Sequence, residues 1–122
     1  MARTNQGVFR ATLNRYDELI TRYEYIMTHN YDELDFLDFL VDCGELYDDI
    51  DEFKHELNGT LKTVKFELDC NSNKYENMTN ELQSAQSEIE RRFREVKSSV
   101  EYTGGFSDVE IDTLDRYSLW RR

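Results

Sequence analysis

The sequence predicts an all-α protein. We expect an antiparallel helical bundle or coiled-coil hairpin with two medium helices, one long helix and a short C-terminal helix. Two observations support this expectation. Apolar residues recur at helical spacing along most of the chain. The 122-residue chain also contains no proline, and 34% of its residues are charged, a composition typical of coiled coils and long helices. This length corresponds to one domain, which we divide into a bundle over residues 1–101 and an appended segment over 102–122.

The first helix is predicted over residues 8–28. Its apolar residues step by four and three positions, which places them on one helical face. They are Phe9, Leu13, Tyr16, Ile20, Tyr23 and Met27. Because the connection around His29 and Asn30 is short, the next helix is expected to run antiparallel to the first.

The second helix is predicted over residues 31–57, where the apolar spacing is that of a helix packed on a partner helix. The repeating residues are Phe36, Phe39, Cys43, Leu46, Ile50, Phe53 and Leu57. In the first half of this helix, other apolar residues lie off that face, so this half should be buried against two neighbours or another chain. Asn58 and Gly59 are expected to end the helix, since glycine is common just beyond a helix C-terminus.

Acidic residues flank the apolar face of the second helix. An acid precedes each of these seven apolar residues by one position, which is a rotation of about 100°, and the first six of these acids form a continuous row. We define the acidic ridge as these six residues with two further acids: Asp35, Asp38, Asp42, Glu45, Asp49 and Glu52, with Asp48 and Asp51. Residues 30–57 contain eleven acids and one lysine, a net charge of −10 in a chain of net charge −11. The acids would lie about 3.3 Å apart along the helix axis, close to the roughly 3.4 Å between phosphates of a DNA strand.

The third helix is predicted over residues 60–101 from apolar residues spaced by seven. These are Leu61, Leu68, Tyr75, Leu82, Ile89 and Val96, which we interpret as an oligomer or bundle seam. A break at residues 70–73 is the alternative, because Asn71-Ser72-Asn73 resembles a turn followed by a capped helix. A helix this long extends beyond the second helix, and a homodimer is one natural way to cover its far end.

The appended segment is expected to begin with a hinge at Gly104 and Gly105. Ser107 and Glu110 then have the spacing of a capping box, which predicts the start of a short helix. Trp120 lies near the end of this segment, and a tryptophan there indicates docking, either within the chain or on a partner. Residues 102–122 are therefore interpreted as a hinge and a short docking helix.

No motif in the chain predicts catalysis, a metal or a cofactor. Glu52 and His55 form half of the Glu-x-x-His pattern of di-iron bundles, which needs a second such pair and further glutamates. The single glycine pair lacks the residues of a phosphate-binding loop. Cys43 lies on the buried face and has no evident catalytic partner. We therefore predict a protein that is not an enzyme.

The chain also lacks the segments that mark secreted and membrane proteins. No apolar run approaches the length of a transmembrane helix. The N-terminus has no apolar signal core, and the two cysteines, Cys43 and Cys70, do not form a disulfide framework. We expect a cytoplasmic, intracellular protein. Its acidity disfavours direct binding to nucleic acid or an anionic membrane.

The acidic ridge gives the functional hypothesis. Like charges on one helix repel each other, and a basic partner would relieve that repulsion. We expect a small protein that inhibits or recruits a basic, nucleic-acid-handling protein by imitating nucleic-acid charge. Small acidic helical proteins encoded by phages offer a class-level analogy.

Two other interpretations stay open. In the simplest interpretation, the ridge is a solvated face that aids solubility and is partly neutralised by arginines of the first and third helices. The other comes from a different class: a structural or assembly coiled coil that forms a homo-oligomer through the helix over 60–101.

Overall fold

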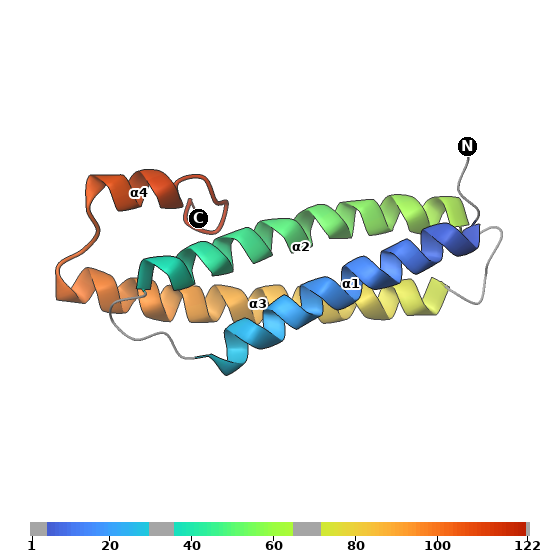
Figure 1. Ribbon diagram of the computed structural model, residues 1–122, viewed down its shortest axis with the longest axis horizontal. Coiled ribbons are helices and arrows are strands. Elements are labelled where there is room, and N and C mark those ends of the chain that lie inside the picture. The colour runs from blue at the N-terminus through green and yellow to red at the C-terminus, as the bar shows by residue number, and fades with distance from the viewer. Residues whose placement is uncertain (1–4, 30–35, 65–71, 122) are drawn as a thin grey trace.

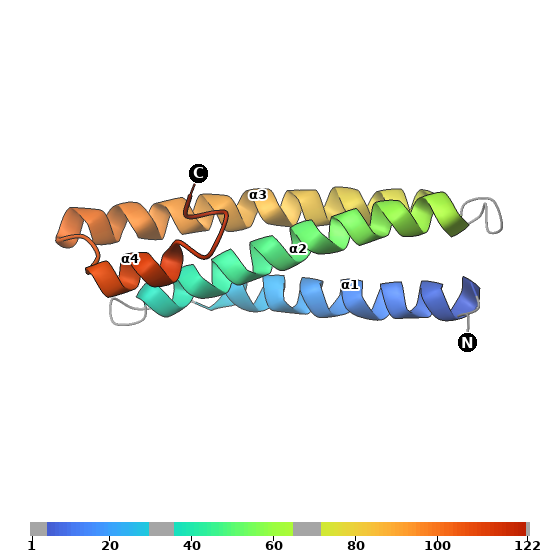
Figure 2. The ribbon, with the colours of Figure 1, turned by 90° about the horizontal axis from the view of Figure 1, so that it is seen from above.

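The computed structural model describes residues 5–29, 36–64 and 72–121. These ranges contain four helices and no strand: α1 (Asn5–Thr28), α2 (Phe36–Val64), α3 (Ser72–Thr103) and α4 (Asp108–Leu114). The three long helices run up, down and up, so that α1 and α3 point the same way (Figures 1 and 2). Helix α4 folds back beside the N-terminal half of α2 (Figure 1). The predicted all-α bundle is confirmed. Within the described ranges, no helix has a segment of the length and apolarity that crossing a membrane requires.

Helix α2 supplies most of the core. Six of its seven apolar residues at the predicted spacing are buried, and Phe36 is half-buried. The buried ones are Phe39, Cys43, Leu46, Ile50, Phe53 and Leu57. They cluster with Tyr75, Leu82 and Ile89 of α3 and with Leu19 and Ile26 of α1. Since burying one such side chain contributes about 1.5–3 kcal/mol, this cluster is the main source of the bundle's stability.

The predicted boundary between the second and third helices is wrong. Helix α2 continues through Asn58 and Gly59 to Val64, and α3 begins at Ser72. The two helices are antiparallel, so residues 60–64 and 72–101 do not form one long helix (Figure 1). The sequence contains the reason, because the apolar spacing of α2 extends from Leu57 in steps of four and three. A glycine inside a helix costs only about 1 kcal/mol, which a continuing apolar stripe outweighs. Residues 70 and 71 of the alternative break at 70–73 lie outside the described residues.

The seven-residue repeat therefore belongs to two helices. Tyr75, Leu82 and Ile89 of α3 are almost completely buried, and Val96 is partly buried against the same core. Leu61 falls on α2 and Leu68 lies outside the described residues. The described α3 part of the repeat is a seam of the bundle within one chain.

Helix α1 is rotated relative to the predicted face. Among its described side chains, the buried ones are Thr12, Leu19 and Ile26, which are spaced by seven. The predicted apolar residues are only partly buried, and we call the described ones the α1 row: Leu13, Tyr16, Ile20, Tyr23 and Met27. The apolar stripe of α1 is thus wider than the surface that α2 and α3 cover.

Two glycines follow helix α3, and the chain reverses direction there toward α4. Gly104 and Gly105 have φ angles of 141° and 81°, which side-chain-bearing residues rarely adopt. The Gly105 N–H donates to the Val100 carbonyl at 2.9 Å. Ser107 then caps α4 through the predicted capping box: the Glu110 N–H donates to its Oγ at 3.3 Å, and its own N–H donates to Glu110 Oε1 at 2.9 Å.

The segment after the hinge packs on the bundle. Leu114 and Leu119 are buried. Trp120 contacts Phe93 and Phe106 edge to face, with ring centroids 6.2 and 5.3 Å apart, and Lys97 Nζ lies 4.4 Å from the Trp120 ring. We call residues 107–121 the C-terminal segment. It covers the N-terminal half of α2, the half that the sequence marks as apolar on more than one side.

Candidate functional site

The acidic ridge lies along α2, beside the face that enters the core. Of its members, Asp38, Glu45, Asp51 and Glu52 are exposed, and Asp42, Asp48 and Asp49 are half-buried. Asp35 lies outside the described residues. The predicted arrangement of the seven described acids beside the core face follows from helix geometry, because the residues opposite or beside a buried stripe must face outwards.

Among the described residues, one ion pair connects α1 with the ridge. Arg22 Nη1 lies 2.7 Å from Asp49 Oδ2, and both side chains are about one-third exposed, at 34% and 36%. Pairs with this much exposure contribute at most about 1 kcal/mol. Asp49 is therefore partly neutralised within the chain.

The C-terminal segment engages two further ridge acids. Tyr117 Oη donates to Glu45 Oε1 at 3.0 Å. The Ser118 N–H donates to Asp48 Oδ2 at 3.3 Å, and its Oγ donates to Asp48 Oδ1. Burial, and then the Glu45 carboxylate, raise the pKa of Tyr117. These contacts hold the C-terminal segment over the first half of α2.

Gly44 makes room for this contact. A Cβ at this position would lie 2.8 Å from both Cβ and Cγ of Tyr117. Sequence reasoning missed Gly44, Tyr117 and Ser118 as contributors to this site. The available signal was Gly44 itself, because a glycine inside a helical pattern often marks a close approach.

The lysine of the acidic region does not turn toward the ridge. Lys54 Nζ donates to Gln86 Oε1 of α3 at 2.8 Å, and Gln86 Nε2 donates to the Tyr47 carbonyl at 3.1 Å. Four acids of α2 are exposed and, within the described ranges, neither take part in an ion pair nor accept a side-chain hydrogen bond; Glu45 is exposed too but accepts from Tyr117. We call them the open carboxylates: Asp38, Asp51, Glu52 and Glu56.

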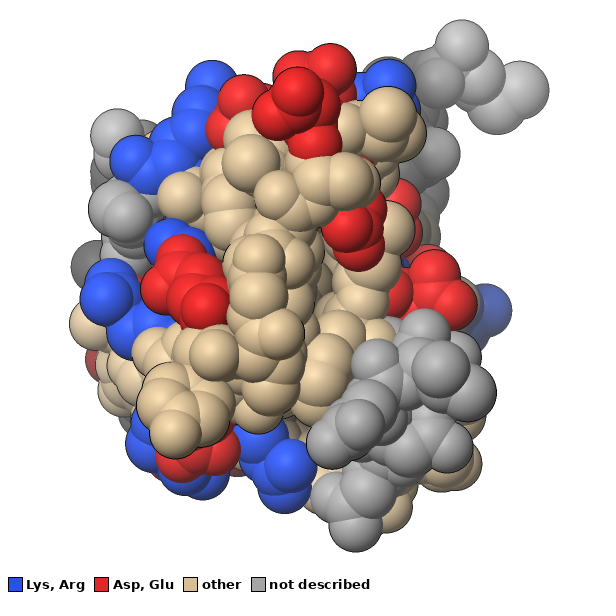
Figure 3. Space-filling model, turned by 90° about the vertical axis from the view of Figure 1, so that its left-hand side faces the viewer, with Lys and Arg blue, Asp and Glu red and all other residues tan. Residues whose placement is uncertain are grey.

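Two arginines of α3 form ion pairs on their own helix. Arg91 pairs with Glu88 and Glu95 at 3.0 and 2.6 Å, and Arg94 pairs with Glu90 at 2.9 Å. At the end of the bundle where α3 leads into α4, side chains of both signs surround an uncharged strip (Figure 3). The charge on that end is mixed, which contrasts with the single sign of the open carboxylates.

The groups considered for chemistry are dispersed or shielded. Glu52 and His55 are both exposed, and in the ranges that the structure describes no three His, Cys, Asp or Glu side chains are grouped as metal ligands. Burial, and then the nearby Asp42 carboxylate, raise the pKa of Cys43 to about 12. Cys43 is therefore a neutral thiol at physiological pH.

The fold and this surface define a class of protein: a three-helix bundle with a short return helix and one carboxylate-rich helical face. No protein-family model, no curated protein and no solved structure matches the chain.

Proposed function

We propose that this chain is a small non-enzymatic protein that binds a basic, nucleic-acid-handling protein of the cytoplasm through α2 and inhibits or recruits it. The observation that supports the proposal is the set of open carboxylates, together with the inward turn of Lys54. Carboxylates without a nearby countercharge attract a lysine- or arginine-rich surface and accelerate its approach.

The length of α2 supports the proposal. Asp38 and Glu52 are two heptads apart, which is about 21 Å along the axis. This length corresponds to roughly six phosphate spacings of one DNA strand. Open carboxylates lie at the two ends of this length, at Asp38 and at Asp51 and Glu52, and the acids between them are half-buried or hydrogen-bonded within the chain.

The alternative, a structural coiled coil that forms a homo-oligomer through the third helix, meets a physical obstacle. Tyr75, Leu82 and Ile89 are buried against the chain's own α1 and α2. An intermolecular seam through these residues would require the bundle to open. Sedimentation at low protein concentration separates the two candidates, because the alternative predicts a stable oligomer.

A pair of charge-matched variants tests the proposal. The first combines Asp38→Lys, Glu52→Lys and Glu56→Lys, which reverses three open carboxylates. We leave Glu45, Asp48 and Asp49 unchanged, since each has a partner within the chain. The control combines Asp17→Lys, Glu76→Lys and Asp112→Lys, three exposed acids outside α2 that take part in no ion pair within the described ranges.

Affinity capture from host-cell lysate with quantitative mass spectrometry provides the measurement. The wild type and the control should retain one basic nucleic-acid-binding protein that the α2 variant loses. Capture should weaken as salt is raised, because charges separated by more than about 8 Å are screened at physiological ionic strength. Equal capture by the two variants would refute the role of α2.

A further inference from the structure

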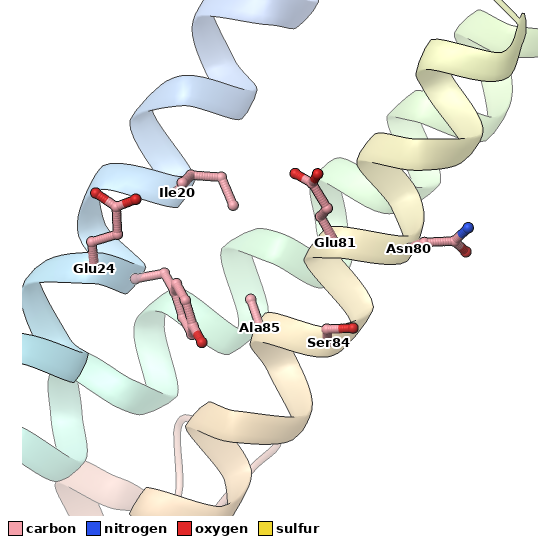
Figure 4. Close-up of a pocket in the computed structure, with 7 residues that line it drawn as sticks. Ile20, Glu24, Asn80, Glu81, Ser84 and Ala85 are labelled. Carbon is pink, nitrogen blue, oxygen red and sulfur yellow. The ribbon is translucent and has the colours of Figure 1, made fainter.

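A groove lies between the parallel helices α1 and α3. It has a volume of about 390 Å³. Ile20 projects from α1 toward α3, Glu81 projects from α3 toward α1, and α2 lies behind them (Figure 4). Tyr23 and Ala85 complete the apolar part of the lining.

The α1 row continues this apolar surface along the helix. Its residues step by three and four positions from Leu13 to Met27, a length of about 21 Å. This is the spacing by which a helix packs on a partner helix. Leu19 and Ile26 are buried in the core that α1 shares with α2 and α3, whereas the α1 row packs against that core and stays only partly buried, so it keeps some apolar surface open to solvent.

The rim of the groove is acidic. Glu24 of α1 and Glu81 of α3 line it, and the described lining residues include no lysine or arginine. Both glutamates are exposed, and neither forms an ion pair with another residue in the described part of the chain. Past Tyr23 along α1, Arg92 Nη2 of α3 donates to the Met27 carbonyl at 3.3 Å and so connects the two helices.

These features favour one kind of occupant. An apolar row at coiled-coil spacing requires leucine-like side chains every three and four residues. Carboxylates on two helices require lysine or arginine beside those apolar side chains. A second copy of this chain fits poorly, because two molecules of net charge −11 repel each other.

We propose that the groove between α1 and α3 is a docking site for a basic amphipathic helix of another protein, which would complete a four-helix bundle. The apolar face of that helix packs on the α1 row and Ala85. Its lysines or arginines reach Glu24 and Glu81. This site uses side chains other than the open carboxylates of α2, so it is a separate contact surface.

A synthetic helical peptide tests the proposal. The probe is a fluorescein-labelled peptide of about three heptads with leucine at positions a and d and lysine at e and g. A peptide of the same composition in scrambled order is its control. Fluorescence anisotropy should show binding of the patterned peptide to the full chain and much weaker binding of the scrambled one.

Adjacent substitutions on α1 show whether the peptide occupies the groove. Ile20→Lys introduces a positive charge inside it, and the long side chain can extend to water, so the fold should be retained. Thr21→Lys makes the same charge change at an exposed neighbour that does not line the groove. We expect Ile20→Lys to weaken binding by at least about tenfold and Thr21→Lys to change it by no more than about twofold. Circular dichroism of each variant verifies the bundle.

Neutralising the rim separates this site from α2. Glu24→Gln with Glu81→Gln should weaken peptide binding several-fold, whereas Asp51→Asn with Glu56→Gln on α2 should not. Absence of binding, equal binding of the two peptides, or equal effects of the paired variants would overturn the proposal. A wild-type dimer that Ile20→Lys dissociates would also overturn it, since a second copy would then fill the groove. None of these outcomes alters the capture experiment on α2, so the two proposals fail independently.

Discussion

Replacing Gly44 with alanine should release the C-terminal segment without unfolding the bundle. The new Cβ would lie 2.8 Å from two carbon atoms of Tyr117, well inside the roughly 3.5–4.0 Å of a normal carbon–carbon contact. Overpacking of this kind costs about 1–3 kcal/mol. Alanine, however, stabilises a helix interior by about 1 kcal/mol relative to glycine. The substitution should therefore stabilise α2 itself and destabilise the contact between α2 and Tyr117.

The result should therefore be an intact bundle with a displaced C-terminal segment. Trp120 is the single tryptophan of the chain and packs on Phe93 and Phe106, so its emission reports this displacement. We expect its emission to move to longer wavelength and proteolysis near Gly104 and Gly105 to accelerate. The far-ultraviolet circular dichroism should change little.

Gly59 provides the matched control on the same helix. A Cβ there would have no atom within 4 Å. Gly59→Ala should raise the free energy of unfolding by up to about 1 kcal/mol and leave the Trp120 emission unchanged. If Gly44→Ala behaves like Gly59→Ala in both measurements, Tyr117 does not pack against Gly44, and the described position of the C-terminal segment on α2 is wrong.

Further predictions concern the core and the buried thiol. Ile89→Ala should lower the free energy of unfolding by about 2–5 kcal/mol in urea denaturation, with no change in the mass measured by sedimentation. A fall in mass would instead support an intermolecular seam. In a Cys70→Ser background, Cys43 should react slowly with a thiol reagent at neutral pH until the chain is unfolded. Its pKa is raised from 9.0 to about 12, so above about pH 9 the unfolded chain loses a proton that the folded chain retains. The free energy of unfolding, relative to that of a Cys43→Ala control, should therefore fall between about pH 9 and pH 12. A difference between the two proteins that does not change with pH would contradict this.

The spacing of apolar residues predicted the core face of α2 well. Phe39, Leu46 and Ile50 are buried where the repeat placed them. A stripe at steps of three and four positions can be removed from water only by turning inwards, so this information is local.

Helix ends were harder to predict, because a local signal competes there with continued packing. Asn58-Gly59 has the residues of a helix stop, yet α2 passes through it. The rotation of α1 has a similar cause. Leu19 and Ile26 share a wide apolar stripe with the α1 row, and the tertiary fit of three helices decides which part is buried.

The candidate site was predictable in composition and not in detail. The acids of α2 lie beside the core face as expected. The hydrogen bonds of Glu45 with Tyr117 and of Asp48 with Ser118 connect residues 72 and 70 positions apart. Nothing in the local sequence pattern indicates such distant pairings. Because these hydrogen bonds engage Glu45 and Asp48, the number of open carboxylates on α2 is smaller than its number of acids.

The most direct test of the proposed function is displacement of nucleic acid from the captured partner. The purified chain is titrated into a complex of that partner with labelled DNA, and anisotropy follows release of the DNA. We predict release by the wild type and by the control with Asp17, Glu76 and Asp112 reversed, but not by the variant with Asp38, Glu52 and Glu56 reversed. A ternary complex that retains the DNA, or equal release by all three proteins, would contradict the imitation of nucleic-acid charge by α2.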